Sequence, residues 1–155
     1  MRKFESLSEL QTLIGQEIAV SDWVDIDQKR IDQFAEVTGD HQWVHVDPVR
    51  AATGPFGATI AHGFLTLSLL PLLSATAMRI GDVKMGVNYG LNKVRFPSPV
   101  KVGSRLRGRF SLVAMEPLPP MGALRGYQLT LNVTMQCEGA DKPACIAESV
   151  SRRYH

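Results

Sequence analysis

The chain has 155 residues, of which 45% are hydrophobic and 21% charged, and its formal net charge at pH 7 is +2. This composition is typical of a globular protein with a substantial core, and we expect one domain over residues 1–155. The small net charge excludes the clustered basic surface of a nucleic-acid-binding protein, so we expect no nucleic-acid partner.

The first half of the chain carries the helix signals. A strand is expected at residues 17–24, followed by a helix whose first amides Asp27 caps and which Gly39 ends. Asp47 as cap, Pro48 at the first helical position and Gly54 at the end then predict a second, short helix.

A long apolar helix is predicted over residues 61–78. The 21 residues from Ala58 to Met78 include no Lys, Arg, Asp or Glu, a length that can span a bilayer. Scattered Thr, Ser and His residues and the lack of a Trp or Tyr belt favour a buried helix over a membrane span. Pro71 should kink this helix, because proline cannot donate to the carbonyl four residues back.

Beyond residue 80 the pattern changes to strands separated by Pro- and Gly-rich gaps. We expect four strands here, at residues 83–96, 105–115, 127–137 and 144–154. Consecutive strands favour an antiparallel sheet. The sequence therefore predicts an α+β fold, with about five antiparallel strands wrapped around the long apolar helix. The open edge of such a sheet favours dimerisation.

The cysteines and the N-terminal residues indicate the cellular compartment. Cys137 and Cys145 form neither a CxxC pair nor a metal-ligand spacing. We expect two reduced thiols in a cytoplasmic protein, with a disulfide across a late hairpin as the alternative. The N-terminal residues lack the apolar segment of a secretion signal.

An acid and a histidine, Asp40 and His45, lie in the break between the first two predicted helices. Loop residues held between rigid elements are frequent positions for reactive side chains, and this pair suits acid–base chemistry. The alternative is structural: Asp40 as a turn residue after Gly39, and His45 as a cover for the next helix.

A second pair, His62 and Gly63, begins the apolar helix. First-turn amides have no intrahelical partner, and a glycine there lets a substrate oxygen approach the backbone closely. The alternative is a core histidine beside a packing glycine. We expect no metal site, since no third ligand is evident near His45 and His62.

Three arginines, Arg105, Arg107 and Arg109, alternate along one predicted strand and therefore share a face. They form either a solvated outer surface or a contact to the phosphates of a nucleotide-bearing substrate. No dinucleotide-binding or P-loop motif is present.

These features together resemble the MaoC-like dehydratases, the (R)-specific enoyl-CoA hydratases of the hotdog fold, and most closely their NodN-like branch. The matching residues are Phe34-Ala35, Thr38-Gly39-Asp40, His45-Val46-Asp47-Pro48, Ala51-Ala52, Ile60-Ala61-His62-Gly63, Leu65 and Ser68, together with Asn88 to Pro97. The first group covers about a quarter of the chain, and the order of helices and strands agrees over nearly all of it.

The resemblance implies reversible addition of water to a trans-2-enoyl-CoA, giving an (R)-3-hydroxyacyl-CoA. His45 would be the base, Asp40 would orient the water and deliver a proton to Cα, and the Gly63 N–H would polarise the thioester carbonyl. It also implies a homodimer and no cofactor, CoA being the carrier of the substrate. Two alternatives remain: an acyl-CoA thioesterase, and a non-catalytic acyl-thioester-binding protein.

Further substrate contacts are expected from residues near these motifs or with suitable charge, namely His62, Trp43, Phe56, Lys93, Arg95, Arg105 and Arg107. The chain departs from the resemblance at two points. Gln42-Trp43 replaces a common Asn-Pro, and Pro71 stands where some hydratases carry a supporting serine. Ser68 or Ser74 would replace that serine only if the kinked helix turns one of them inward.

Overall fold

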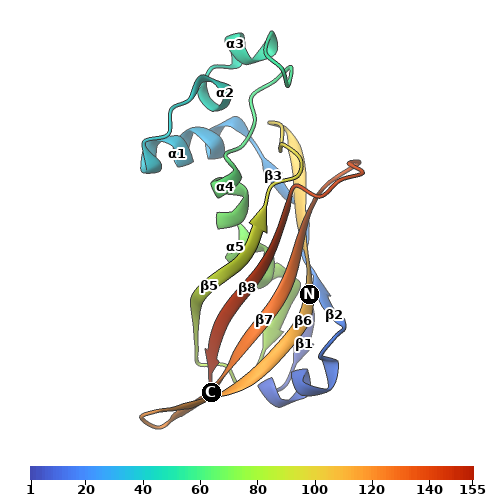
Figure 1. The fold of residues 1–155 in the computed structure, drawn as a ribbon, viewed down its shortest axis with the longest axis vertical. Helices are drawn as coiled ribbons and strands as arrows, with labels where there is room; N and C mark the ends of the chain where they lie inside the picture. The colour runs from blue at the N-terminus through green and yellow to red at the C-terminus, as the bar shows by residue number, and fades with distance from the viewer.

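The computed structural model describes residues 1–155, and its main feature is a curved sheet with helices against one face and beyond one end (Figure 1). The elements in chain order are β1 (Arg2–Phe4), a 3-10 helix η1 (Leu7–Leu13), β2 (Glu17–Val20), β3 (Val24–Ile26), α1 (Gln28–Thr38), α2 (Trp43–Val46), α3 (Pro48–Ala52), α4 (Gly63–Ser68), α5 (Leu70–Ala77), β4 (Met78–Ile80), β5 (Met85–Arg95), β6 (Ser104–Met121), β7 (Leu124–Cys137) and β8 (Cys145–Tyr154).

The main sheet has six strands in the order β2-β6-β7-β8-β5, with β3 paired beside β2 on β6. All its pairings are antiparallel, as expected for consecutive strands. β5 pairs only with β8 and so forms an edge of the sheet. A separate two-stranded sheet joins β1 to β4 in parallel, an addition that the sequence pattern did not predict.

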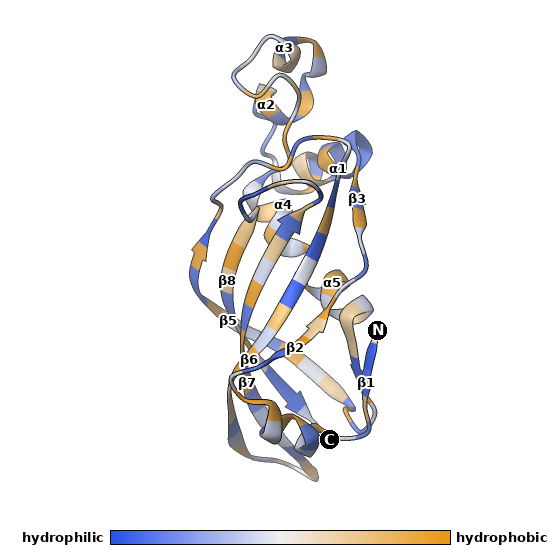
Figure 2. Cartoon of the chain, turned by 90° about the vertical axis from the view of Figure 1, so that its right-hand side faces the viewer, coloured by the Kyte–Doolittle hydropathy of each residue, from blue (hydrophilic) through white to orange (hydrophobic).

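The core lies between the inner face of this sheet and α4 and α5. Alternate residues of the central strands are buried, such as Leu129, Leu131 and Val133 on β7, and Figure 2 shows the bands of orange and blue that this alternation produces. The helices contribute Leu65, Leu69, Leu73 and Ala77 to the same core, one residue per turn of helix.

The central helix is shorter than predicted, because α4 and α5 are separate elements that meet at Leu69. Pro71 has no N–H for the carbonyl of Leu67, so the regular bonding pattern is interrupted there. The break thus begins two residues before the proline. No helix of the structure has the length and apolar character needed to cross a membrane.

Two strand predictions also need correction. The expected strand at residues 17–24 is divided into β2 and β3, which gives the main sheet six strands in place of about five. The expected gap around Pro117 is instead the paired end of β6 and β7, with Pro117 opposite Tyr127. β2 pairs with β6 only as far as Ser111. Beyond Ser111, β6 has no neighbour on that side, so a proline, which lacks an N–H, is tolerated there.

Helix α1 begins and ends as its sequence predicts. The Asp27 carboxylate accepts a hydrogen bond from the Arg30 N–H at 2.8 Å, and Gly39 adopts a left-handed conformation with φ of 75°. α3 begins with the same device, because Asp47 accepts from the Arg50 N–H at 3.0 Å. Gly39 and the Asp47 cap therefore fix the two ends of the segment that carries Asp40 and His45.

Candidate active site

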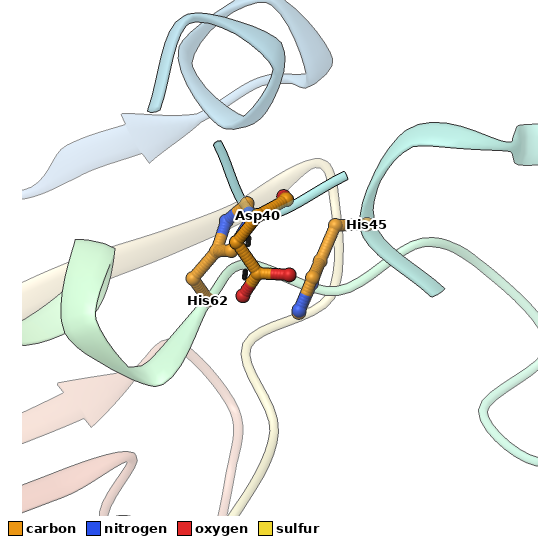
Figure 3. A group of neighbouring side chains, drawn as sticks. All are labelled: Asp40, His45 and His62. Carbon is orange, nitrogen blue, oxygen red and sulfur yellow. Dashed lines mark hydrogen bonds and ion pairs between the residues drawn. The ribbon is translucent and has the colours of Figure 1, made fainter. Parts of the chain in front are cut away.

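Asp40, His45 and His62 come together where α1, α2 and α4 meet. One nitrogen or oxygen atom from each residue lies within 4.8 Å of the other two. Figure 3 shows the Asp40 carboxylate in front of the two imidazole rings, beside both His45 and His62. The left-handed turn at Gly39 directs the chain from α1 into this position, so the predicted helix stop also places the acid.

The backbone fixes the orientation of His45. Its Nδ1 lies 2.7 Å from the carbonyl oxygen of Ile60, which can only accept, so Nδ1 carries the proton. The lone pair is therefore on Nε2. Burial is the largest influence on this side chain and lowers its pKa from 6.5, although the hydrogen bond to Ile60 opposes that effect. His45 is a neutral base at neutral pH.

His62 lies against His45 as a second, almost fully buried imidazole. The two rings stack with centroids 3.7 Å apart and an interplanar angle of 24°. Nε2 of His62 donates to the backbone carbonyl of Asp40 at 2.9 Å and lies 4.0 Å from its carboxylate. Its Nδ1 is buried without a hydrogen-bond partner. His62 thus holds both the backbone of Asp40 and the ring of His45.

The structure places Asp40 close to His45 and His62, so a third potential metal ligand is present that the sequence analysis did not expect near the two histidines. Metal binding requires the ring nitrogens to direct their lone pairs at one point about 2.0–2.1 Å away. Stacked rings direct their lone pairs side by side, and Nδ1 of His45 and Nε2 of His62 are already engaged with carbonyl groups. The geometry favours proton transfer over metal binding.

A cavity of about 270 Å³ adjoins His45 and the start of α4. Gly63, Thr66, Phe56 and Phe96 are among its lining residues. A Cβ on Gly63 would lie 3.0 Å from the Phe96 ring, so a glycine keeps this opening clear. The candidate oxyanion donor and the candidate base therefore face the same space.

Replacing Gly63 by alanine is expected to lower the free energy of unfolding by about 1–2 kcal/mol through this contact with the Phe96 ring. Thermal or urea unfolding measures the change. Adding Phe96→Ala should remove part of the Gly63→Ala penalty. A penalty that is the same with and without the ring would contradict the contact as its cause.

The other residues predicted to contact substrate are spread more widely. Trp43 stacks with Arg50 and packs against Gly54, at the edge of the α2–α3 segment. Lys93 and Arg95 are exposed on β5, and Lys93 has an unusual positive φ of 51°. None of the three lines the cavity beside His45.

Arg105 is engaged on the outer face of the sheet. It forms an ion pair with Glu138 and lies over the Trp23 ring, which Arg107 also covers at 4.5 Å. Arg109 pairs with Glu17 at 2.7 Å. These arginines thus form an outer surface on which Arg105 and Arg109 are paired with acidic residues. Of the two expectations from the sequence, this arrangement favours the outer surface over the phosphate contact.

The two serines considered as replacements for Pro71 differ in their surroundings. Ser68 is exposed, and its hydroxyl donates to the Phe64 carbonyl at 2.7 Å. Ser74 is half-buried and lines a hollow between α5 and the sheet. Neither lines the cavity that holds His45.

Three contributors to the site carried no recognisable sequence signal. The Ile60 carbonyl sets the tautomer of His45, and a backbone acceptor is invisible in a side-chain pattern. Gln28 donates to the His45 carbonyl at 2.8 Å and accepts from Thr59, tying α1 to α2. Thr66, which lines the cavity, reads in the sequence as an ordinary helix residue.

A curved antiparallel sheet over a broken apolar helix, with an acid and a neutral histidine at the helix mouth, defines the class of hotdog hydro-lyases. The MaoC-like domain matches residues 9–123. Over 152 residues the chain is 54% identical to 3-hydroxyacyl-thioester dehydratase Z of Mycobacterium tuberculosis, with 98% of each chain covered.

Nodulation protein N of Rhizobium leguminosarum is 47% identical over 151 residues, covering 94% of this chain and 89% of the relative. Among solved structures, the unliganded R-hydratase PhaJ1 of Pseudomonas aeruginosa superimposes with a TM-score of 0.64 at 25% identity, covering 92% of this chain and 85% of that one. The chain belongs to the MaoC-like dehydratase family, and it is a hydro-lyase with a hotdog fold.

Proposed function

We propose that the protein catalyses the reversible addition of water to a trans-2-enoyl-CoA, giving the (R)-3-hydroxyacyl-CoA. The observation that carries this proposal is the neutral His45, whose unprotonated Nε2 lies beside the Asp40 carboxylate at the mouth of α4. The site residues and the stereochemistry are part of the proposal.

His45 is the general base. Its Nδ1–H is held by the Ile60 carbonyl, which leaves Nε2 to take a proton from a water molecule as the water oxygen bonds to C3. The stacked His62 keeps the ring in this plane, and its own position is fixed by the hydrogen bond from Nε2 to the Asp40 carbonyl.

Asp40 orients the water and delivers the proton to C2. Its side chain is 55% exposed, so substrate and water can reach it. His45 passes the proton that it takes from water to the Asp40 carboxylate, and Asp40 then delivers this proton to C2, which restores the neutral histidine and the carboxylate. The reaction adds one water molecule and leaves the protein unchanged.

The Gly63 N–H is the proposed donor to the thioester oxygen, where negative charge develops during attack at C3. It opens the first turn of α4, where amides have no intrahelical acceptor. The cavity that Gly63 and His45 share would hold the reacting end of the substrate.

The named relatives support this proposal. The relative from M. tuberculosis is described as acting on 3-hydroxyacyl thioesters, and the R-hydratase from P. aeruginosa carries the stereochemical designation in its name. No cofactor enters the mechanism. We place the reaction in the cytoplasm, with residues 1–155 acting as one domain, in keeping with the two unpaired thiols of Cys137 and Cys145.

The proposal is tested by incubating the protein with trans-2-crotonyl-CoA and longer enoyl-CoA thioesters. We expect loss of the enoyl absorbance, no release of free CoA thiol, and an (R)-3-hydroxyacyl product by chiral analysis. Free thiol would indicate a thioesterase, an (S) product would contradict the stereochemistry, and binding without any product would indicate a non-catalytic protein.

The pH dependence follows from the burial of His45. A base must be unprotonated, and burial lowers its pKa from 6.5, so kcat/KM should be at its maximum above pH 6.5 and fall only as the pH drops through the lowered pKa. The free energy of unfolding should follow the same trend. The folded protein binds fewer protons at His45 than the unfolded chain does, so the stability is full above pH 6.5 and falls as the pH drops through the lowered pKa. An acid limb of log kcat/KM centred above pH 6.5 would contradict the assignment.

We also propose a homodimer formed along β5. This strand is an edge of the sheet, and its exposed large side chains include Val87, Tyr89 and Leu91. An exposed apolar edge strand is a template for pairing, and a second copy of the chain is the usual way to cover it.

Replacing Leu91 by aspartate should shift the protein from dimer to monomer, because a charge would be buried at the interface. Light scattering coupled to gel filtration measures the mass. Val49→Asp is the matched control, since Val49 is even more exposed but lies on α3. A monomeric wild-type protein, or a dimer unaffected by Leu91→Asp, would contradict the proposed interface.

A further inference from the structure

A larger hollow, separate from the cavity beside His45, lies farther along the central helices. It has a volume of about 460 Å³ and lies between α5 and the sheet, with Pro71, Ser74 and Met78 on the helix side. A neighbouring hollow of about 420 Å³ shares Leu70, Pro71 and Asn88 with it and reaches back to Leu67 on α4. Pro71 is eight residues, or about 12 Å of helix, beyond Gly63.

The inner face of β8 carries small side chains, of which Ser149 lines the smaller hollow. Cys145, Ala147, Ser149 and Ser151 are buried at alternate positions and are all small. The next residue of that row, Arg153, lines the larger hollow. The buried residues of this row on β8 are small and uncharged, and the row ends at Arg153, whose guanidinium group lies across the hollow from α5.

Gly86 on β5 makes room for this arginine. Gly86 and Arg153 are directly opposed in the antiparallel pairing of β5 and β8. A Cβ on Gly86 would lie only 2.0 Å from Nη1 of Arg153, so the guanidinium occupies the space that any other residue would fill. The side chain is seated in a formed recess of the sheet.

The charge of Arg153 has no partner within the chain. The residues that line the hollow include a second cation, Arg79, and no Asp or Glu. Burial alone accounts for the lowered pKa of Arg153, with no acidic group opposing it. A guanidinium withdrawn from water without an anion is costly, and a carboxylate on a ligand would relieve that cost.

We propose that Arg153, assisted by Arg79, binds a carboxylate at the distal end of the substrate's acyl chain. The proposal rests on the proposed function, because the hollow is taken to receive the acyl group whose thioester reacts beside Gly63. It names the substrate class: enoyl thioesters whose chain ends in a carboxylate, in preference to plain chains of the same length.

Kinetics provide the first test. A series of ω-carboxy-trans-2-enoyl-CoA thioesters of increasing length is compared with plain enoyl-CoA thioesters of equal length. We expect kcat/KM to favour the carboxylated chain at the length that reaches Arg153, and Arg153→Gln to lower this preference by about 10-fold to 100-fold, the effect of losing one charged hydrogen bond. Arg125→Gln, at an exposed arginine of β7, is the matched control.

Gly86→Ala supplies an independent variant that keeps the charge. The new Cβ meets the flexible end of Arg153 and must displace it, so the preference should fall as in Arg153→Gln while the fold is retained. A preference unchanged by both variants, or no preference at any length, would overturn the proposal. So would an Arg153→Gln protein that loses its dimeric mass without any change in preference, because the arginine would then serve the interface.

Binding separates this proposal from the proposed function. Calorimetric titration with saturated ω-carboxyacyl-CoA and plain acyl-CoA thioesters requires no turnover. Tighter binding of the carboxylated ligand that Arg153→Gln abolishes would support the arginine site even if no enoyl-CoA were hydrated. Hydration of crotonyl-CoA combined with equal binding of both ligands would overturn the arginine site and leave the proposed function standing.

Discussion

Replacement of His45 by glutamine is expected to lower kcat for hydration by about 10²–10⁴-fold, the contribution of a general base. Glutamine can still donate to the Ile60 carbonyl, so the local backbone should keep its position. What it lacks is a nitrogen lone pair that takes a proton. Stopped or continuous assays on an enoyl-CoA measure kcat, and circular dichroism verifies the fold.

His41→Gln is the matched control for this variant. His41 is an exposed histidine four residues away whose partner is Glu36, outside the cluster. Its replacement should leave kcat within about twofold, a range typical of surface substitutions without effect on stability. If His45→Gln were as active as His41→Gln, the base would have to be another group.

Replacement of Asp40 by asparagine should also lower kcat by about 10²–10⁴-fold. The side chain is half exposed, and His62 binds the backbone carbonyl of Asp40, which the substitution leaves in place. Asparagine keeps the size of the side chain but can neither accept a proton from His45 nor deliver one to C2. The loss should therefore fall on turnover, with the melting temperature nearly unchanged.

A control acid and a readout of structure complete this experiment. Asp22→Asn alters an exposed carboxylate between β2 and β3 and should have no effect on kcat. A loss of activity in Asp40→Asn that matches a loss of folded protein would assign Asp40 to the architecture. Full activity in a folded Asp40→Asn protein would remove it from the mechanism.

Much of the fold could be predicted because its signals are local. The Asp27 and Asp47 caps, the stop at Gly39 and the late strands depend on a few adjacent residues, and the structure has them where expected, apart from the longer paired end of β6 and β7. The family and its hotdog fold were recognised from the motif around Asp40 and His45, and the comparisons confirm both.

What the sequence could not predict depends on contacts between distant segments. The stacking of His45 on His62 and the hydrogen bond to Ile60 join residues 15 or more positions apart. Pro117, which is paired near the end of β6, is tolerated because β2 stops at Ser111, and no local pattern reveals where β2 stops. Likewise, Arg153 reads as a surface arginine until Gly86 and α5 surround it.

Following the oxygen atom of water distinguishes hydration of the double bond from hydrolysis of the thioester. The protein is incubated with an enoyl-CoA in water enriched in heavy oxygen, and the product is analysed by mass spectrometry and chiral chromatography. We expect the label in the hydroxyl group at C3 of an (R)-3-hydroxyacyl-CoA. Label in the carboxylate of a free acid, with release of CoA thiol, would contradict it and identify thioester hydrolysis as the reaction.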